Sequence, residues 1–163
     1  AGLSYIVPKL HNLMLHAEYD YNRLTFSNSF NDFFSNHSIF LSAELPFRIG
    51  RAQQVSLGAD TNVSLHADPS PPRRHEFDVY AGYAVNLTRS LSLGAVGRIF
   101  VRDYQNIDRT DVSEVLTLSA NYRITDYFSA GAASTFAWSQ SSRSVFDYEV
   151  ANIGGTLSLS FRF

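Results

Sequence analysis

Residues 39–49, IFLSAELPFRI, decide the fold of this chain. Counted in steps of two, one series of side chains is wholly apolar, while the other carries Ser42, Glu44 and Arg48. A period of two is that of a β-strand, because successive side chains of a strand point to opposite faces of the sheet. The stretch therefore predicts a strand with one apolar face and one largely polar face.

The same alternation recurs along the rest of the chain. The further runs are residues 13–21, 55–67, 77–87, 91–101, 116–124, 128–138 and 151–163. Over all the runs, Thr61 and Ser134 are the only polar residues of the apolar series, and none of its residues is charged. No stripe of helical period competes with this pattern. The sequence predicts an all-β protein, with eight strands as the most favoured count.

Length and composition exclude several classes of protein. The chain has 163 residues, of which 17% are charged and 14% aromatic, and no cysteine; this length suits one domain. The longest uninterrupted apolar run, residues 80–85, is far below the roughly 20 residues that a transmembrane helix needs. With a net charge of −2, the chain also lacks the basic surface that nucleic acid requires.

The polar series decides which way the sheet faces. It carries charged side chains, of which Glu18, Glu44, Asp60, Arg98, Arg102 and Arg123 are predicted lumen charges. Such a face cannot form a dry core without a large desolvation cost. The arrangement with the lower desolvation free energy turns the apolar face to lipid and the polar face to a closed lumen. The sequence therefore predicts a transmembrane antiparallel up-and-down β-barrel.

The connections between the runs alternate in length. Residues 22–38, 68–76, 102–115 and 139–150 form long connections, and residues 50–54, 88–90 and 125–127 form short ones. Bacterial outer-membrane barrels have short periplasmic turns and longer outer loops, which predicts both termini on the periplasmic side. We expect residues 12–163 to form the barrel, and residues 1–11 to be a periplasmic lead-in, a lumen segment or the remnant of an upstream domain.

Aromatic residues gather at both ends of the apolar series. Tyr19, Tyr21, Phe77, Phe136 and Trp138 lie toward the long connections, and Phe47, Tyr122, Phe128, Phe161 and Phe163 toward the short ones. Two aromatic girdles flanking an aliphatic band are typical of membrane-spanning barrels. These residues are predicted to lie at the two lipid interfaces.

The last run ends in Leu157, Leu159, Phe161 and Phe163. This ending resembles the C-terminal assembly signal of bacterial outer-membrane barrels. The resemblance implies location in the outer membrane of a Gram-negative bacterium, with the barrel assembly machinery as a partner during insertion. The size is similar to that of the small eight-stranded barrels of the OmpA and OmpX kind.

The predicted lumen charges suggest two roles. Arg98 is expected to reach Glu18 or its neighbours across an eight-stranded ring, and the charges then form either a structural plug or a cation-preferring constriction. Many other lumen positions are Gly, Ala or Ser. They make room for long side chains, leave a water-filled cavity, or belong to a wider barrel completed by further strands or by another copy.

An enzyme is the competing class. Ser64 and His66 are predicted to share the inward face near Asp68 or Glu76, a grouping with a faint resemblance to outer-membrane lipid A deacylases. Side chains two residues apart are neighbours rather than opposed partners, which disfavours a nucleophile and base pair. The five histidines show no metal-ligand spacing, and no cofactor is predicted.

The long connections suggest partners. Residues 68–75 are rich in proline and end in basic residues that could contact lipopolysaccharide phosphates. Residues 22–37 carry Phe26, Phe30, Phe33 and Phe34, which could dip into the interface, cap the lumen or contact a partner protein. The sequence thus predicts a structural barrel or a narrow porin-like channel, with the lipid A enzyme or a membrane anchor or adhesion subunit as alternatives.

Overall fold

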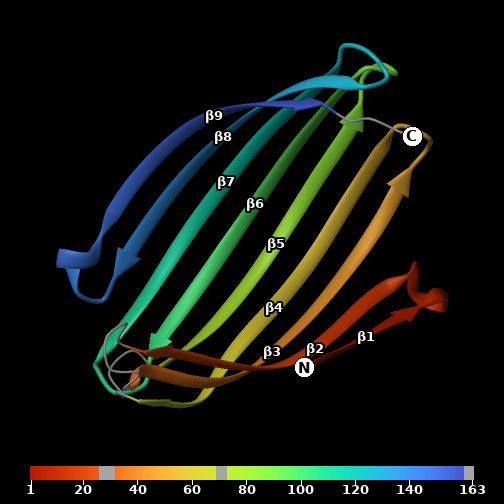
Figure 1. The fold of residues 1–163 in the computed structure, drawn as a ribbon. Coiled ribbons are helices and arrows are strands. Elements are labelled where there is room, and N and C mark those ends of the chain that lie inside the picture. Colours follow the sequence, from red (N-terminus) through yellow and green to blue (C-terminus); the bar gives the residue numbers. More distant parts are fainter. Residues whose placement is uncertain (26–31, 69–72, 160–163) are drawn as a thin grey trace.

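The computed structural model describes residues 1–25, 32–68 and 73–159. These residues form one curved antiparallel sheet, in which the strands lie side by side in chain order (Figure 1). The strands are β1 (Gly2–Val7), β2 (Leu13–Thr25), β3 (Asp32–Ile49), β4 (Gln53–Asp68), β5 (Arg74–Asn86), β6 (Leu91–Tyr104), β7 (Arg109–Arg123), β8 (Phe128–Ser141) and β9 (Tyr148–Leu159). Two 3-10 turns, η1 (Pro8–Leu10) and η2 (Ser144–Phe146), lie in the connections. No described helix is long and apolar enough to cross a membrane.

The described sheet has nine strands, which corrects the predicted count of eight. The additional strand is β1, and it comes from the segment that was expected to precede the barrel. Leu3 pairs with Ala17 and Val7 with Leu13 of β2. The backbone then turns through His11 and Asn12, both with positive φ. With six residues before Pro8, β1 is too short for its alternation to stand out in the sequence.

The sheet is open within the described residues. β1 pairs only with β2 and β9 only with β8, so closure into a barrel is not part of the observed architecture. Figure 1 shows these two strands at opposite margins of the curved sheet. The all-β, antiparallel, up-and-down arrangement is confirmed.

The strands extend well past the predicted runs at one end of the sheet. β3 has 18 residues, and β6 and β7 are separated only by residues 105–108. The predicted long connections 22–38 and 102–115 are therefore largely strand. The sequence does not predict these extensions, because polar residues occupy both faces of the extended parts of the strands and the two-residue period is lost in them.

Burial in this sheet is the reverse of that in a water-soluble protein. Among the described residues, the buried positions are polar apart from Ala67 and Gly82; the polar ones are Ser38, Ser64, Asp78, Asp111, Ser113 and Ser139. Large apolar side chains remain exposed, for example Leu41 at 46% and Phe77 at 51%. The fold thus turns its apolar side chains outward and gathers polar ones on the concave inner face.

Candidate functional site

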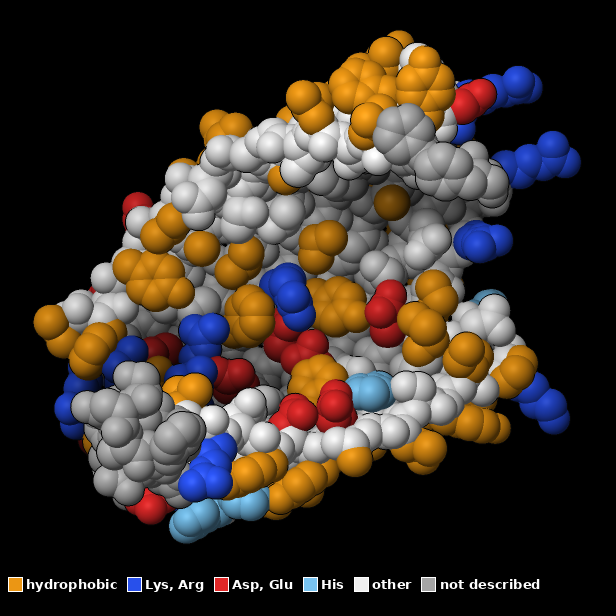
Figure 2. All heavy atoms as spheres, in the orientation of Figure 1, with side chains coloured by type: hydrophobic (Ala, Val, Ile, Leu, Met, Phe, Trp, Pro, Cys, Tyr) orange, Lys and Arg blue, Asp and Glu red, His pale blue; other side chains and the backbone are white. Residues whose placement is uncertain are grey.

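The candidate site is the charged part of the inner face. Figure 2 shows acidic and basic side chains gathered in the hollow of the sheet, with aromatic and aliphatic carbons between them. The charged groups come from β2 to β6, which alternation places on one face. Toward β7–β9 the same face is lined by small residues such as Ser119, Gly131 and Ala133.

Arg98 of β6 is the centre of this cluster. Its Nη2 atom lies 3.4 Å from Oδ2 of Asp60 and forms a closer ion pair with Oδ2 of Asp78. Asp60 and Asp78 are themselves register partners on β4 and β5, so two like charges face each other across the strands. Because like charges in that position repel, Arg98 is the group that makes their pairing tolerable.

Aromatic rings fix the guanidinium of Arg98 from two sides. The Tyr80 ring centroid lies 5.1 Å from Cζ of Arg98, and the Phe100 centroid lies 5.0 Å from it. Both distances suit cation–π attraction. Asp78 is 2% exposed, and its Oδ1 atom and Nε of Arg98 have no hydrogen-bond partner among the described protein atoms. The cluster thus holds a buried donor and a buried acceptor that water could satisfy.

Tyr80 links the cluster to β3. Its hydroxyl donates a 3.1 Å hydrogen bond to Oε2 of Glu44, and its ring passes over Gly58 of β4. A Cβ added to Gly58 would overlap the Tyr80 ring. The glycine therefore opens the path by which the tyrosine crosses one strand to reach the next.

Two further polar groups flank this centre. Nε of Arg102 lies 3.2 Å from Oε1 of Glu76, which also accepts a 2.7 Å bond from Nε of Arg74. On β2, Nε2 of His16 lies 3.2 Å from Oε2 of Glu18. Polar contacts therefore run across the inner face from β1–β2 to β6.

The predicted lumen charges are only partly brought together. Glu44, Asp60, Arg98 and Arg102 belong to the network of β3–β6, whereas Glu18 contacts His16. The expected contact of Arg98 with Glu18 is not the one observed, because Arg98 pairs with carboxylates on β4 and β5. Arg123 lies at the short-connection end, where its Nη2 atom donates to the Arg89 carbonyl at 2.9 Å.

Asp78 was not among the predicted site residues, although it is the most buried member of the cluster. Its position two residues before Tyr80 places it on the inner face of β5. The alternation of β5 therefore predicts that Asp78 faces inward. It does not predict that Asp78 pairs with Arg98, because this contact depends on the register between β5 and β6, in which Tyr80 is opposite Arg98.

The predicted interface aromatics lie on the outer face wherever they are described. Tyr19, Tyr21, Phe77, Tyr122 and Trp138 are between 42% and 52% exposed, whereas Phe47, Phe128 and Phe136 are half-buried. Phe136 and Trp138 stack with ring centroids 6.4 Å apart. Leu157 and Leu159 of the predicted assembly signal are exposed on β9, and Phe161 and Phe163 lie outside the described residues.

Ser64 and His66 do not share a face, in contrast to the sequence-based expectation. Ser38 pairs with Ser64 but His37 pairs with His66, so the register shifts at Leu65. This β-bulge leaves Ser64 inside, where its Oγ donates a 2.5 Å hydrogen bond to Oδ1 of Asn36. It turns His66 outward, 6.2 Å from the His37 ring, so no nucleophile and base pair is assembled.

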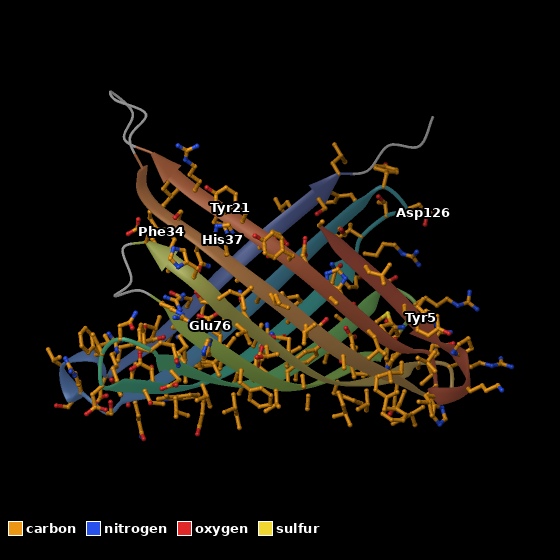
Figure 3. All side chains as sticks on the ribbon, turned by 90° about the horizontal axis from the view of Figure 1, so that it is seen from below. Tyr5, Tyr21, Phe34, His37, Glu76 and Asp126 are labelled. Atoms are coloured by element: carbon orange, nitrogen blue, oxygen red, sulfur yellow. The ribbon has the colours of Figure 1, made fainter. Side chains whose placement is uncertain are left out.

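His37 belongs to an outer-face ring cluster at this end of the sheet. Figure 3 shows it beside Tyr21 on neighbouring strands, and the two ring centroids are 4.6 Å apart. Nδ1 of His37 is also hydrogen-bonded to the Tyr19 hydroxyl. The predicted interface tyrosines are thus positioned by cross-strand contacts as well as by alternation.

The residues proposed for outer partners are only partly described. Of the four loop phenylalanines, Phe26 and Phe30 lie outside the described residues, the Phe33 side chain is not described, and Phe34 is half-buried. Arg73 donates through Nε to the Ser64 carbonyl at 3.1 Å, and Arg74 pairs with Glu76. Both arginines are therefore engaged within the sheet.

A separate ion pair lies beside the β6–β7 connection, beyond the apolar run 116–124. Nε and Nη2 of Arg109 donate to the two carboxylate oxygens of Asp111 at 2.9 and 2.5 Å. The Arg109 guanidinium lies 3.5 Å from the Phe146 ring centroid. The hydrogen bonds from Arg109 hold the pKa of the Asp111 carboxyl below its ordinary value. The contact of Arg109 with the Phe146 ring joins β7 to η2.

Among the described residues, no group of three or more histidine, aspartate or glutamate side chains is placed to hold a metal ion.

Comparison of the chain with protein-family models, with characterised proteins and with solved structures gave no match.

Proposed function

We propose that this chain forms the wall of an integral β-barrel in the bacterial outer membrane, with its inner face lining a narrow, water-filled interior. The observation that carries the proposal is the inverted burial: among the described residues, the buried side chains are polar except that of Ala67, while Leu41, Phe77 and Leu118 are exposed on the opposite face. A face of this kind is stable when hydrocarbon covers it. The aromatic residues at both ends of the apolar band support the same placement.

The charges of the inner face favour cations in that interior. On the inner face of β2–β6, carboxylates outnumber guanidinium groups: the carboxylates are those of Glu18, Asp20, Glu44, Asp60, Glu76 and Asp78, and the guanidinium groups are those of Arg48, Arg74, Arg98 and Arg102. Rings of acidic side chains select cations in pores. Glu44 interacts with a neutral hydroxyl, so its charge is not cancelled by a guanidinium in the way that of Asp78 is.

The membrane placement is tested by fractionation. In a Gram-negative host, the protein should sediment with the outer membrane, resist extraction by carbonate and require detergent for solubility. Unboiled samples should migrate differently from boiled samples in denaturing gels, because a folded membrane barrel resists the detergent. Recovery as a monomer in the aqueous fraction would overturn the proposal.

The channel is tested in planar bilayers under a salt gradient. We expect a small conductance whose reversal potential shows preference for cations, and a weaker preference in Glu44→Gln. The matched control is Glu114→Gln, since Glu114 is exposed on the outer face opposite Trp138 and should leave selectivity unchanged. Equal selectivity of the two variants would exclude Glu44 from the lining of a pore.

The structure gives no support to a lipid A hydrolase built on Ser64 and His66. The bulge at Leu65 places the two side chains on opposite faces of β4. A structural or channel role is the better proposal because it uses the inner-face charges that the fold does bring together.

A further inference from the structure

Asp60 and Asp78 bring two carboxyl groups together on the inner face. They are register partners on β4 and β5, and their side chains are close enough to form a hydrogen bond with each other. Asp78 is 2% exposed, and the side chain of Asp60 is 21% exposed. An ionised carboxylate has acceptor atoms only, so two ionised groups in this position repel each other and form no hydrogen bond.

Arg98 supplies one positive charge to these two carboxyl groups. Its Nη2 atom contacts Oδ2 of Asp60 and Oδ2 of Asp78, so a single nitrogen is divided between them. If both carboxyl groups were ionised, the three side chains together would keep one negative charge. In a place as enclosed as that of Asp78, a charge without a partner is strongly unfavourable.

The other charged groups of this part of the inner face lie elsewhere or have other partners. On β5 and β6, Arg74 and Arg102 both contact Oε1 of Glu76. On β3, Glu44 accepts the hydrogen of the Tyr80 hydroxyl. Further from the pair lie His16 and Glu18, which contact each other on β2, Asp20 of β2 opposite Ser38, Arg48 of β3 opposite Gln54, and Asp111 of β7 with Arg109. None of these contacts brings a second cation to Asp60 or Asp78.

One proton on the pair satisfies both requirements. It removes the excess negative charge, and it converts one carboxyl group into a donor for the other. Oδ1 of Asp78 is a buried acceptor without a hydrogen-bond partner among the described protein atoms, and buried acceptors of this kind are normally satisfied. Two carboxyl groups in a shared site hold a single proton when their charges repel, and that proton belongs to the pair rather than to either residue.

We propose that Asp60 and Asp78 hold one proton between them at neutral pH, which makes the pair a proton-binding site of the inner face. The site itself requires only the enclosure and proximity of the two side chains. Its consequence for the channel rests on the proposed function. With the proton bound, Arg98 balances the remaining charge of the pair, and cation preference depends on carboxylates such as Glu44. Raising the pH removes the proton, adds one negative charge to the inner face and increases the preference for cations.

Infrared spectroscopy of the folded protein, in a detergent without carbonyl groups, tests the site directly. A protonated carboxyl group has a carbonyl stretching band that an ionised carboxylate lacks, and labelling the aspartate carboxyl carbon with ¹³C assigns the band to aspartate. The test variants are Asp60→Asn and Asp78→Asn, since asparagine keeps a donor but has no titratable proton. The matched control is Asp126→Asn, because Asp126 is exposed in the connection between β7 and β8 (Figure 3).

At neutral pH we expect a band of one carboxyl group in the unmodified protein and in the control, and its loss in both test variants. The band should also disappear as the pH is raised. Its absence from the folded, unmodified protein would overturn the inference, since both groups would then be ionised and bridged by water or a cation. A band that persists in both test variants would overturn it as well, because the proton would lie elsewhere. The unmodified protein alone decides the first point, whether or not a variant folds.

Reversal potentials in planar bilayers test the consequence for the channel. Cation preference should increase in the unmodified protein as the pH is raised above neutrality. Glu44→Gln should keep this increase, and Asp60→Asn should lose it. An increase of the same size in Asp60→Asn would show that another group is responsible and would overturn the link to the pair. A protein that shows the aspartate band but conducts no ions would contradict the proposed channel and leave the proton site supported.

Discussion

At the scale of single residues, the contact of Tyr80 with Gly58 joins neighbouring strands of the inner-face network. The Tyr80 ring occupies the space above Gly58 and brings its hydroxyl to Glu44. The ring also lies beside the Arg98 guanidinium. A single missing side chain on β4 therefore allows strands β3, β5 and β6 to share one polar cluster.

Gly58→Ala should lower the free energy of unfolding by about 1–3 kcal/mol, because the added methyl group forces the Tyr80 ring from its position. Denaturant unfolding in detergent micelles, followed by tryptophan fluorescence, measures the change. Gly97→Ala is the matched control, since nothing lies within 4 Å of a Cβ added there. If Gly58→Ala proves as well tolerated as Gly97→Ala, the ring does not occupy this position.

Arg98→Ala should cost more, about 3 kcal/mol, because it leaves the buried Asp78 carboxylate facing Asp60 without a cation. The same unfolding assay measures the loss. Arg123→Ala serves as the control, since that arginine donates only to an exposed carbonyl at the sheet end. Removing both charges in Arg98→Leu with Asp78→Leu should restore much of the stability; a double variant no more stable than Arg98→Ala would contradict the ion-pair explanation.

At the scale of elements, alternation predicts those parts of the strands that carry a continuous apolar series. It locates β4 and β8 well, since the runs 55–67 and 128–138 fall inside Gln53–Asp68 and Phe128–Ser141. It misses the first part of β7, where Thr110 and Glu114 lie on the face that is apolar further along. The alternation is clear only along the apolar series, so it vanishes where polar residues occupy both faces of a strand.

Pairing partners were less predictable than faces. The inner face of Arg98 follows from alternation, but its contact with Asp78 requires the β5–β6 register. The bulge at Leu65 illustrates the same limit, because Leu65 and Ala67 continue the apolar series as if no residue had been inserted. A bulge is defined by two residues facing one on the neighbouring strand, which a single strand's sequence does not specify.

The bulge itself can be tested with cysteines. His37→Cys with His66→Cys should form a disulfide on oxidation, because these positions are directly opposite on the outer face. Deleting Leu65 in the same variant should leave that disulfide in place, since the deletion removes only the extra residue and keeps position 66 opposite position 37. The control pair, Ser38→Cys with Ser64→Cys, should cross-link with or without Leu65. A disulfide between positions 37 and 66 that forms only after the deletion would show that no bulge is present.

At the scale of the whole molecule, the described sheet has two chemically different faces. The inner face carries a network of ion pairs that needs water or polar partners, while the outer face exposes a continuous apolar band. Neither face could exchange places with the other without leaving charges in hydrocarbon. Because the faces differ, the same substitution at adjacent residues of one strand should cost different amounts of stability.

Leu118 and Thr117 of β7 provide that comparison. Leu118 is 42% exposed on the outer face, and Thr117 lies on the inner face, with its Oγ1 atom 3.3 Å from that of Thr135. In phospholipid vesicles, Leu118→Arg should lower the free energy of unfolding by about 2–4 kcal/mol, because the arginine enters the bilayer. Thr117→Arg should cost no more than about 1 kcal/mol, because its charge projects into the wet interior. Equal costs for the two variants would mean that the outer face does not meet lipid, since water on both sides would accept either arginine.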